Sequence, residues 1–350
     1  MHVETPPRTP PTPPRRELRR AGPDHSQAIR RSVQLAFLAL NLWIAAEFYL
    51  FVRYFETAGS TWRVSRPPGV EGWLPVAALM NLKALLVTGQ FPLMHAAGMF
   101  LMAAFILGSW LFRKSFCGWL CPVGTVSEYL WRLGRSAFGR NFRVSRRTDL
   151  ALRSVKYLLL ALFLYAVAFM SVPAIREFLD GPYGTLSDVK MLNFFRYLGL
   201  AGGAVVAALA LASVFVQNFW CRYLCPYGAL LGLFSTASPL KIRRDTDLCI
   251  DCAKCAKSCP AALPVDRLVT IRSAECTGCM QCVASCPAAG ALIMSAPRTR
   301  RVPAWAFAAG ALGIFFAFYL CARLTGHWHT SLPDSVYFDL IPRANEFTHP

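Results

Sequence analysis

Charged residues are scarce in this sequence. Of its 350 residues, 16% are charged and 55% are hydrophobic, and only 19 are acidic. Soluble domains usually carry about 25% charged residues, so the composition argues against that class and favours an integral membrane protein. The formal net charge of +18 raises nucleic acid as a partner, but basic residues around apolar segments are more typical of a membrane surface. We therefore expect a lipid bilayer as the partner and no nucleic acid.

Several cofactor motifs are also absent. Neither G-x-G-x-x-G nor a P-loop occurs, which argues against nicotinamide and nucleotide chemistry. No C-x-x-C-H occurs, which argues against c-type haem. Of the six histidines, only His95 falls within a long apolar segment, whereas haem between membrane helices needs spaced histidines. The first 24 residues lack an apolar stretch, so they do not read as a signal peptide.

Apolar segments of membrane-spanning length are present. A bilayer core requires ~20 residues of helix, and five segments come close to that length, namely 32–52, 91–112, 154–172, 195–217 and 303–321. A sixth segment, 73–89, is shorter and contains Pro75 and Lys83, so we expect it to be interfacial or re-entrant. The predicted fold is an all-α integral membrane protein with about five transmembrane helices.

Basic residues predict how these segments are oriented. Residues 1–31, 113–153 and 218–302 hold 7, 9 and 11 Lys and Arg, whereas 53–90, 173–193 and 322–350 hold 4, 2 and 2. Cytoplasmic loops carry the excess of such residues, so the first group is expected to face the cytoplasm. The Pro- and Arg-rich residues 1–31 predict a disordered basic arm on that side, near anionic lipid.

Two dense cysteine runs follow the fourth apolar segment. They read CIDCAKCAKSCP from Cys249 and CTGCMQCVASCP from Cys276, the bacterial [4Fe–4S] pattern in which the fourth cysteine serves the other cluster. Zinc is the alternative, but four-cysteine zinc sites usually have two C-x-x-C pairs with a longer gap. We predict an inserted, small α+β ferredoxin module with two [4Fe–4S] clusters. The expected ligands are Cys249, Cys252, Cys255 and Cys286 for cluster 1, and Cys276, Cys279, Cys282 and Cys259 for cluster 2.

A second cysteine motif occurs twice, as FCGWLCPVGT at 116–125 and WCRYLCPYGA at 220–229. Each copy follows an apolar segment expected to run from outside to inside. Two hairpins related by an axis along the membrane normal would bring the pairs together at the cytoplasmic rim. The cysteines concerned are Cys117, Cys121, Cys221 and Cys225. Four thiolates suit an iron–sulfur cluster or copper(I), while redox-active thiols and a purely structural bend remain alternatives.

Two further features concern charged residues. Glu47 lies inside the first apolar segment, where a carboxylate is costly and is therefore a functional candidate. We take it as a proton acceptor for a quinol, although contact with water or with Arg53 is the alternative. On the second outer loop, Asp188 and Lys190 predict a local surface pair.

The paired F/W-C-x-x-x-C-P motifs and the double ferredoxin run together resemble the membrane polyferredoxins of the NapH, NosR and CcoG kind, over about residues 32–290. The resemblance implies electron transfer at the bacterial cytoplasmic (inner) membrane, from a quinone-pool or cytoplasmic donor to a respiratory or reductase partner. Copper reduction during oxidase assembly and redox sensing are the alternatives. The expected organisation is a basic arm at 1–31, a four-helix membrane domain at 32–240, the ferredoxin module at 241–301, and a fifth helix with an outer tail at 302–350.

Overall fold

Three long apolar helices form the frame of the protein in a computed structural model that describes residues 20–142, 144–297, 300–330 and 332–349. Each is long and apolar enough to cross a membrane, and they are α1 (Ser26–Glu56), α5 (Arg146–Phe169) and α13 (Ala304–Leu324). Large apolar side chains such as Trp43 and Leu158 are about 70% exposed on their surfaces. Side chains of this kind on a long helix fit contact with lipid rather than water.

The remaining apolar helices are shorter. They are α2 (Pro75–Thr88), α3 (Ala96–Leu111), and the pair α8 (Ser187–Arg196) and α9 (Leu200–Phe215). The pair passes the length and composition test for a span only together, and it is bent by 85°. Among the described residues there are thus three candidate spans, or four if the bent pair is one span. The predicted total of five spans stays a prediction.

The amino-terminal boundary differs from the sequence prediction. Residues 1–19 of the predicted arm lie outside the described residues. Arg20, however, forms a β-bridge with Ala288 of the cysteine-rich module, and α1 already begins at Ser26, whose amide donates to the Asp24 carboxylate at 2.8 Å. The arm therefore does not extend to residue 31, because polar residues of the first helical turns find partners in the module.

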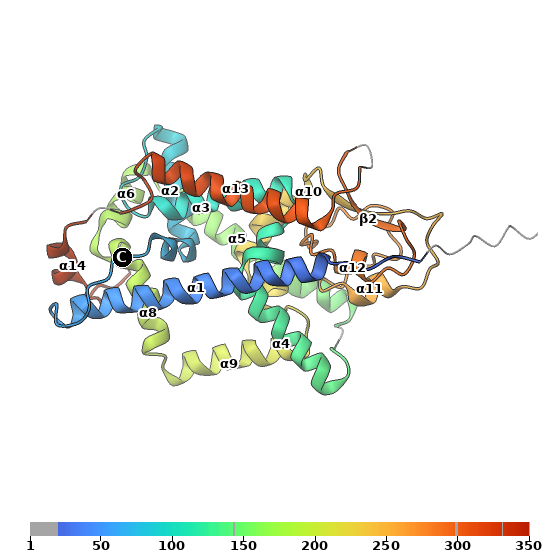
Figure 1. The fold of residues 1–350 in the computed structure, drawn as a ribbon. Helices are drawn as coiled ribbons and strands as arrows, with labels where there is room; N and C mark the ends of the chain where they lie inside the picture. The colour runs from blue at the N-terminus through green and yellow to red at the C-terminus, as the bar shows by residue number, and fades with distance from the viewer. Residues whose placement is uncertain (1–19, 143, 298–299, 331, 350) are drawn as a thin grey trace, which may run out of the picture.

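The cysteine-rich module lies at one end of the helical body (Figure 1). Its two antiparallel strands, β1 (Lys241–Arg244) and β2 (Leu292–Ser295), pair with Lys241 opposite Ser295. Its short helices are α11 (Lys254–Ser258) and α12 (Gln281–Ala284). Buried side chains of the strands, Ile242 and Met294, share one apolar core with Trp119 and with Phe307 of α13. The module is thus packed directly on the membrane helices.

The opposite end of the body is built from short elements. These are η1 (Pro68–Trp73), α6 (Val172–Asp180), α7 (Pro182–Thr185) and α14 (Asp334–Leu340). In Figure 1, α14 lies beside the far end of α1. Phe51 and Phe55 of α1 pack there against Tyr337 of α14, so the carboxy-terminal segment closes this end.

Candidate iron–sulfur centres

The two cysteine runs fold into the same loop. In the first run Asp251 and Ala253 have positive φ angles of 53° and 54°, and in the second Gly278 and Met280 have 64° and 57°. Three of these four are not glycine, so the left-handed conformation costs energy and must be held by the surroundings. Each loop then enters a short helix, α11 or α12. Matching strained turns in both runs fit loops that wrap around a bound group.

The second predicted ligand set, which we call quartet 2, is brought together. All four of its cysteines line one small, mainly apolar cavity, with Ile242, Leu263 and Ile271 among its walls. The quartet consists of Cys259, Cys276, Cys279 and Cys282. Burial, with the nearby Cys279 thiol, raises the pKa of Cys259 to about 12. Burial likewise raises the pKa of Cys282. Such thiols become good ligands only when a metal replaces their protons.

The other predicted set, quartet 1, lies nearer the surface. Its members are Cys249, Cys252, Cys255 and Cys286. The Cys252 side chain is exposed. Cys286 interacts electrostatically with Cys252 and Cys249, and these contacts add to burial in raising its pKa. The fourth cysteine of each run is thus beside the first three of the other run, as the ferredoxin pattern requires.

The donor set fits an iron–sulfur cluster in two respects. The ligands are all sulfur, and apolar walls surround quartet 2, which is the environment that sets cluster potentials. Within the part of the chain that the structure describes, no three His, Cys, Asp or Glu side chains approach closely enough to hold a single metal ion. A [4Fe–4S] cluster does not need such an approach, because each thiolate binds a different iron.

The C-x-x-x-C-P motifs form a second, duplicated structure. Each begins with a π-helical turn, η2 (Phe116–Leu120) or η3 (Trp220–Leu224), and then enters a new helix, α4 (Pro122–Phe138) or α10 (Pro226–Thr236). The proline occupies the first helical position, where its missing N–H costs nothing. The second cysteine caps the new helix, since Cys121 Sγ accepts from the Gly124 amide at 3.5 Å and Cys225 Sγ from the Gly228 amide at 3.2 Å. A helix amino terminus favours a thiolate there.

The two motifs meet in one cavity of about 1080 Å³. Cys117, Cys121, Cys221 and Cys225 all line it. The four side chains are partly exposed, and burial raises the pKa of Cys117 to about 11 and that of Cys121 to about 12. The cavity wall also includes Lys114 and Glu275. The ammonium of Lys156 pairs with both Glu275 oxygens at 2.7 Å, and Glu275 directly precedes Cys276 of quartet 2.

The two motifs differ in what they contact. In the first, Gly118 leaves no space for a side chain, because a Cβ would lie 2.7 Å from the Thr277 carbonyl oxygen. The corresponding residue of the second motif, Arg222, pairs with Asp149 at 2.7 Å. The cysteine-rich module therefore rests on the first motif, while the second is fastened to α5.

The structure shows the surroundings of Glu47, the predicted proton acceptor. It is half-buried in α1 and lines the same cavity as the four motif cysteines. No described residue forms a hydrogen bond or ion pair with its side chain, so the alternative contact with Arg53 is not made. Arg53 instead pairs with Glu56 at 3.3 Å. The carboxylate is therefore free to interact with a molecule in the cavity.

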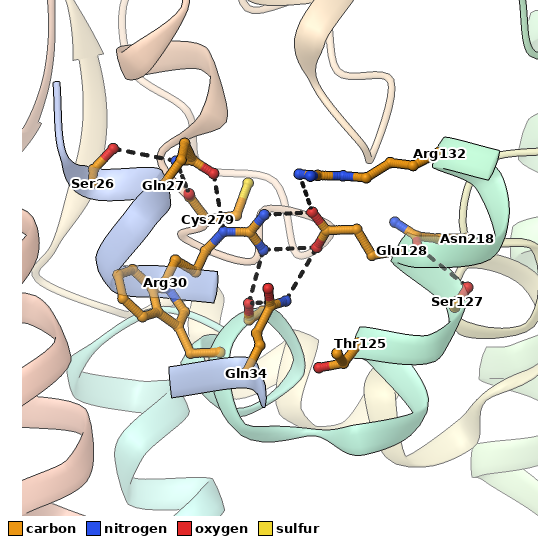
Figure 2. Close-up of polar contacts among 12 residues, drawn as sticks. Ser26, Gln27, Arg30, Gln34, Thr125, Ser127, Glu128, Arg132, Asn218 and Cys279 are labelled. Atoms are coloured by element: carbon orange, nitrogen blue, oxygen red, sulfur yellow. Dashed lines mark hydrogen bonds and ion pairs between the residues drawn. The ribbon is translucent and has the colours of Figure 1, made fainter. Parts of the chain in front are cut away.

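The sequence analysis did not predict the buried ion pairs, of which Lys156 with Glu275 is one. Near quartet 2, Arg30 and Glu128 form an ion pair (Figure 2), with the Arg30 side chain 1% exposed. At the other end, Glu71 is completely buried and pairs with Arg66 at 2.8 Å. Asp188 also pairs with Arg66, at 2.7 Å. The predicted surface pair of Asp188 with Lys190 is thus wrong, because Asp188 is buried and neutralised by an arginine far away in the sequence.

Comparisons with known proteins show which family the chain belongs to. A model described as a 4Fe–4S binding domain matches residues 94–141 and 198–245, and one described as a 4Fe–4S dicluster domain matches 241–287. The chain is 50% identical over 326 residues to the putative electron transport protein YccM of Escherichia coli K12, which covers 91% of both chains. The chain belongs to the YccM family.

More distant relatives share parts of this polyferredoxin. The regulatory protein NosR of Pseudomonas aeruginosa is 31% identical over 170 residues, which are 48% of this chain and 22% of NosR. The ferredoxin-type protein NapH of Haemophilus influenzae is 28% identical over 189 residues, 54% of this chain and 60% of NapH. No solved structure matches. The resemblance to membrane polyferredoxins is confirmed, and the protein is an iron–sulfur electron-transfer protein of the membrane.

Proposed function

We propose that this polyferredoxin transfers single electrons between a hydroquinone in the bilayer and a redox partner protein, through two [4Fe–4S] clusters on the cytoplasmic side of the bacterial inner membrane. Cluster 1 is assigned to Cys249, Cys252, Cys255 and Cys286, and cluster 2 to Cys276, Cys279, Cys282 and Cys259. Their ferredoxin spacing and the shared cavity of quartet 2 support this assignment. The proposal also includes five membrane spans. The module at 241–301 lies between the four-helix domain at 32–240 and the last helix and tail at 302–350.

One observation carries the choice of donor. A single, largely apolar cavity is lined by the four motif cysteines and by Cys279 of quartet 2, and also by Trp43 and Glu47 of α1. Pockets for small hydrophobic ligands are typically 300–1,000 Å³ and apolar with a few polar groups, and the volume here is about 1080 Å³. The ring and part of the isoprenoid chain of a membrane quinone fit that description.

Glu47 has a specific role in this proposal. Oxidation of a hydroquinone to a quinone releases two electrons and two protons, so the site needs a proton acceptor as well as an electron acceptor. Glu47 is half-buried in the cavity wall and unpaired among the described residues. A carboxylate in such a position is suited to accept a proton from the ligand.

The four motif cysteines are assigned as a further cluster site next to quartet 2, since among the described residues no three such ligands approach closely enough for a single metal ion. The ammonium groups of Lys114 and Lys156 lower the pKa of the Cys117 thiol, against the larger opposing effect of burial. Positive charge beside four sulfurs favours an anionic thiolate complex. The same feature supports a second candidate function, reduction of copper(II) to copper(I), because thiolates are preferred ligands of copper(I).

The function is tested with anaerobically purified, full-length protein. Iron and sulfide analysis should give at least about eight irons per chain, four for each cluster, and zinc without iron would end the cluster assignment. A water-soluble hydroquinone should reduce the protein. We expect Glu47→Gln to slow that reduction by about a hundredfold, the usual contribution of a general base, with reduction by dithionite unchanged.

The matched control is Glu177→Gln, which changes an exposed carboxylate of α6 and should behave as the unaltered protein. Equal rates for Glu47→Gln and the control would contradict the role of Glu47. A protein that the hydroquinone cannot reduce, but that is oxidised by copper(II) after reduction with dithionite, would favour the copper function.

A further inference from the structure

The guanidinium of Arg30 is enclosed where three segments meet (Figure 2). It belongs to the start of α1 and donates to both oxygens of the Glu128 carboxylate on α4, at 2.8 and 2.5 Å. It also donates to the carbonyl of Gly118 in η2, at 3.1 Å. Gln34, one turn further along α1, donates to the same two residues at 3.1 and 3.2 Å. Arg30 and Gln34 therefore lock α1, η2 and α4 together.

Further hydrogen bonds connect Arg30 and its neighbours to the loop of quartet 2. The Arg30 Nε donates to the Gln27 side-chain oxygen at 3.1 Å, and the Gln27 amide donates to the carbonyl of Cys279 at 2.9 Å. Next to Gly118, the Trp119 indole N–H donates to the carbonyl of Gly278 at 3.2 Å. With the close approach of Gly118 to Thr277, residues outside the module thus contact three successive residues of the quartet 2 loop, Thr277–Cys279.

In the described residues, no side chain from outside the module forms a hydrogen bond with the equivalent loop of quartet 1. Asp251, which corresponds to Gly278, is 82% exposed at its side chain, and its ion pair at 3.4 Å is with Arg244 of the module itself. Ile250 is 47% exposed and Cys252 is exposed. The sequence pattern makes the two quartets equivalent, but their attachment to the membrane helices makes them different.

The charge of Arg30 adds a second difference. An arginine side chain stays protonated at any accessible pH, and that of Arg30 interacts electrostatically with Cys279. A group that gains an electron on reduction becomes more negative, so a nearby fixed positive charge in a water-poor site favours its reduced form. Loss of this charge would also leave Glu128 paired only with Arg132 among the described cations, which acts in the same direction.

We propose that Arg30 is a positioning residue for quartet 2, which holds the Thr277–Cys279 loop against the first C-x-x-x-C-P motif and gives the cluster bound there a higher reduction potential than that of quartet 1. The inference rests on the proposed cluster assignment. It concerns the position and charge of residues outside the module, and it does not depend on whether the electron donor is a hydroquinone.

The test measures the potential of each cluster in full-length protein in lipid nanodiscs, by electron paramagnetic resonance at a series of applied potentials. A Cys252→Ser variant, which disables quartet 1, identifies the signal of quartet 2. Arg30→Gln removes the charge, whereas Arg30→Lys keeps it but cannot form the forked contact. Arg196→Gln is the matched control, because Arg196 makes the same kind of forked contact with Glu56, at 2.7 and 2.9 Å, at the end of α1 that is far from quartet 2.

We expect Arg30→Gln to lower the reduction potential of the quartet 2 signal or to abolish that signal. With Arg30→Lys, the potential should return most of the way to that of the unaltered protein. The quartet 1 signal should stay unchanged in both variants. Equal shifts of both signals, no shift, or the same shift in Arg196→Gln would overturn the proposal. Should Arg30→Gln fail to accumulate, Gln27→Ala breaks the hydrogen bond to Cys279 with the ion pair intact. It should move the same signal by less, and an unmoved signal would count against the proposal. Iron content in the unaltered protein reports separately on the cluster assignment.

Discussion

Charged side chains are buried at the end of the molecule opposite the cysteine-rich module, and the buried carboxylate there has several partners. The Glu71 carboxylate accepts from Arg66 at 2.8 Å, from Thr330 at 2.9 Å and from the Gly98 amide at 3.1 Å. Burial alone would raise the pKa of Glu71, but Arg66 and His95 outweigh it and lower the pKa to about 2. A carboxylate that is fully buried yet ionised must be stabilised by these contacts, because an unpaired charge in such a place is costly.

Glu71→Gln should therefore destabilise the protein by about 3–5 kcal/mol at neutral pH, since it leaves Arg66 only partly paired. The folded-state pKa of Glu71 lies below its ordinary value of 4.5, so its contribution is fully present above about pH 4.5 and is lost as the pH falls towards 2. Thermal melting followed by circular dichroism should show a gap between variant and unaltered protein that narrows below pH 4.5. The control Glu346→Gln removes an exposed ion pair and should leave melting unchanged, and a gap of constant size across this pH range would contradict the assignment.

The same residues show what the sequence could and could not reveal. The candidate ligand cysteines could be predicted because cluster loops need fixed local spacing, and Glu47 could be proposed because a carboxylate stands out in an apolar segment. Arg30 and Glu128 are separated by 98 positions, and no local pattern connects them. Asp188 was misassigned for the same reason, since a charge next to Lys190 suggested a neighbour whereas the fold supplies Arg66.

At the level of elements, the residue after the first cysteine determines what each C-x-x-x-C-P motif packs against. Both copies form a π-helical turn followed by a helix with proline in its first position. The residue after the first cysteine is Gly118 in one copy and Arg222 in the other. Gly118 lets the turn approach the module, and Arg222 binds α5 instead. The duplication was visible in the sequence, but the surface on which each copy packs depends on the tertiary fold.

Gly118→Val should push the quartet 2 loop away from η2. A Cβ at this position would lie 2.7 Å from the Thr277 carbonyl oxygen, and because that oxygen belongs to the backbone, the loop itself must move. Overpacking of this kind typically costs about 1–3 kcal/mol. We expect a lower melting temperature and faster loss of iron to a chelator. The same change at Gly313 of α13, where a Cβ meets nothing within 4 Å, should have little effect on iron loss, and equal iron loss in both variants would contradict the packing argument.

At the level of the whole molecule, the two ends differ in chemistry. The cysteine-rich module and the start of α1 lie at one end, and α14 and the far end of α1 lie at the other (Figure 1). Of the 37 Lys and Arg, most belong to the segments predicted to be cytoplasmic, which include the module. Free thiols persist in the reducing cytoplasm, so charge and cysteine chemistry favour the same orientation. The bend of 85° between α8 and α9 was not predicted, because the sequence analysis assigned 195–217 to one apolar segment and left most of the more polar α8 in the preceding connection.

This orientation predicts opposite results for reporters at two places in the chain. Alkaline phosphatase, which is active only outside the cytoplasm, should be active when fused after residue 350 and inactive when fused after residue 140, in the connection between α4 and α5. A fluorescent protein that matures only in the cytoplasm should give the reverse pattern. Activity of both phosphatase fusions would mean that an even number of spans, rather than the predicted three, separates residue 140 from residue 350. It would also place the first C-x-x-x-C-P motif on the outer side. A membrane quinone site that delivers electrons to a cytoplasmic module requires the first result, because the motif cysteines and Cys279 line the same cavity.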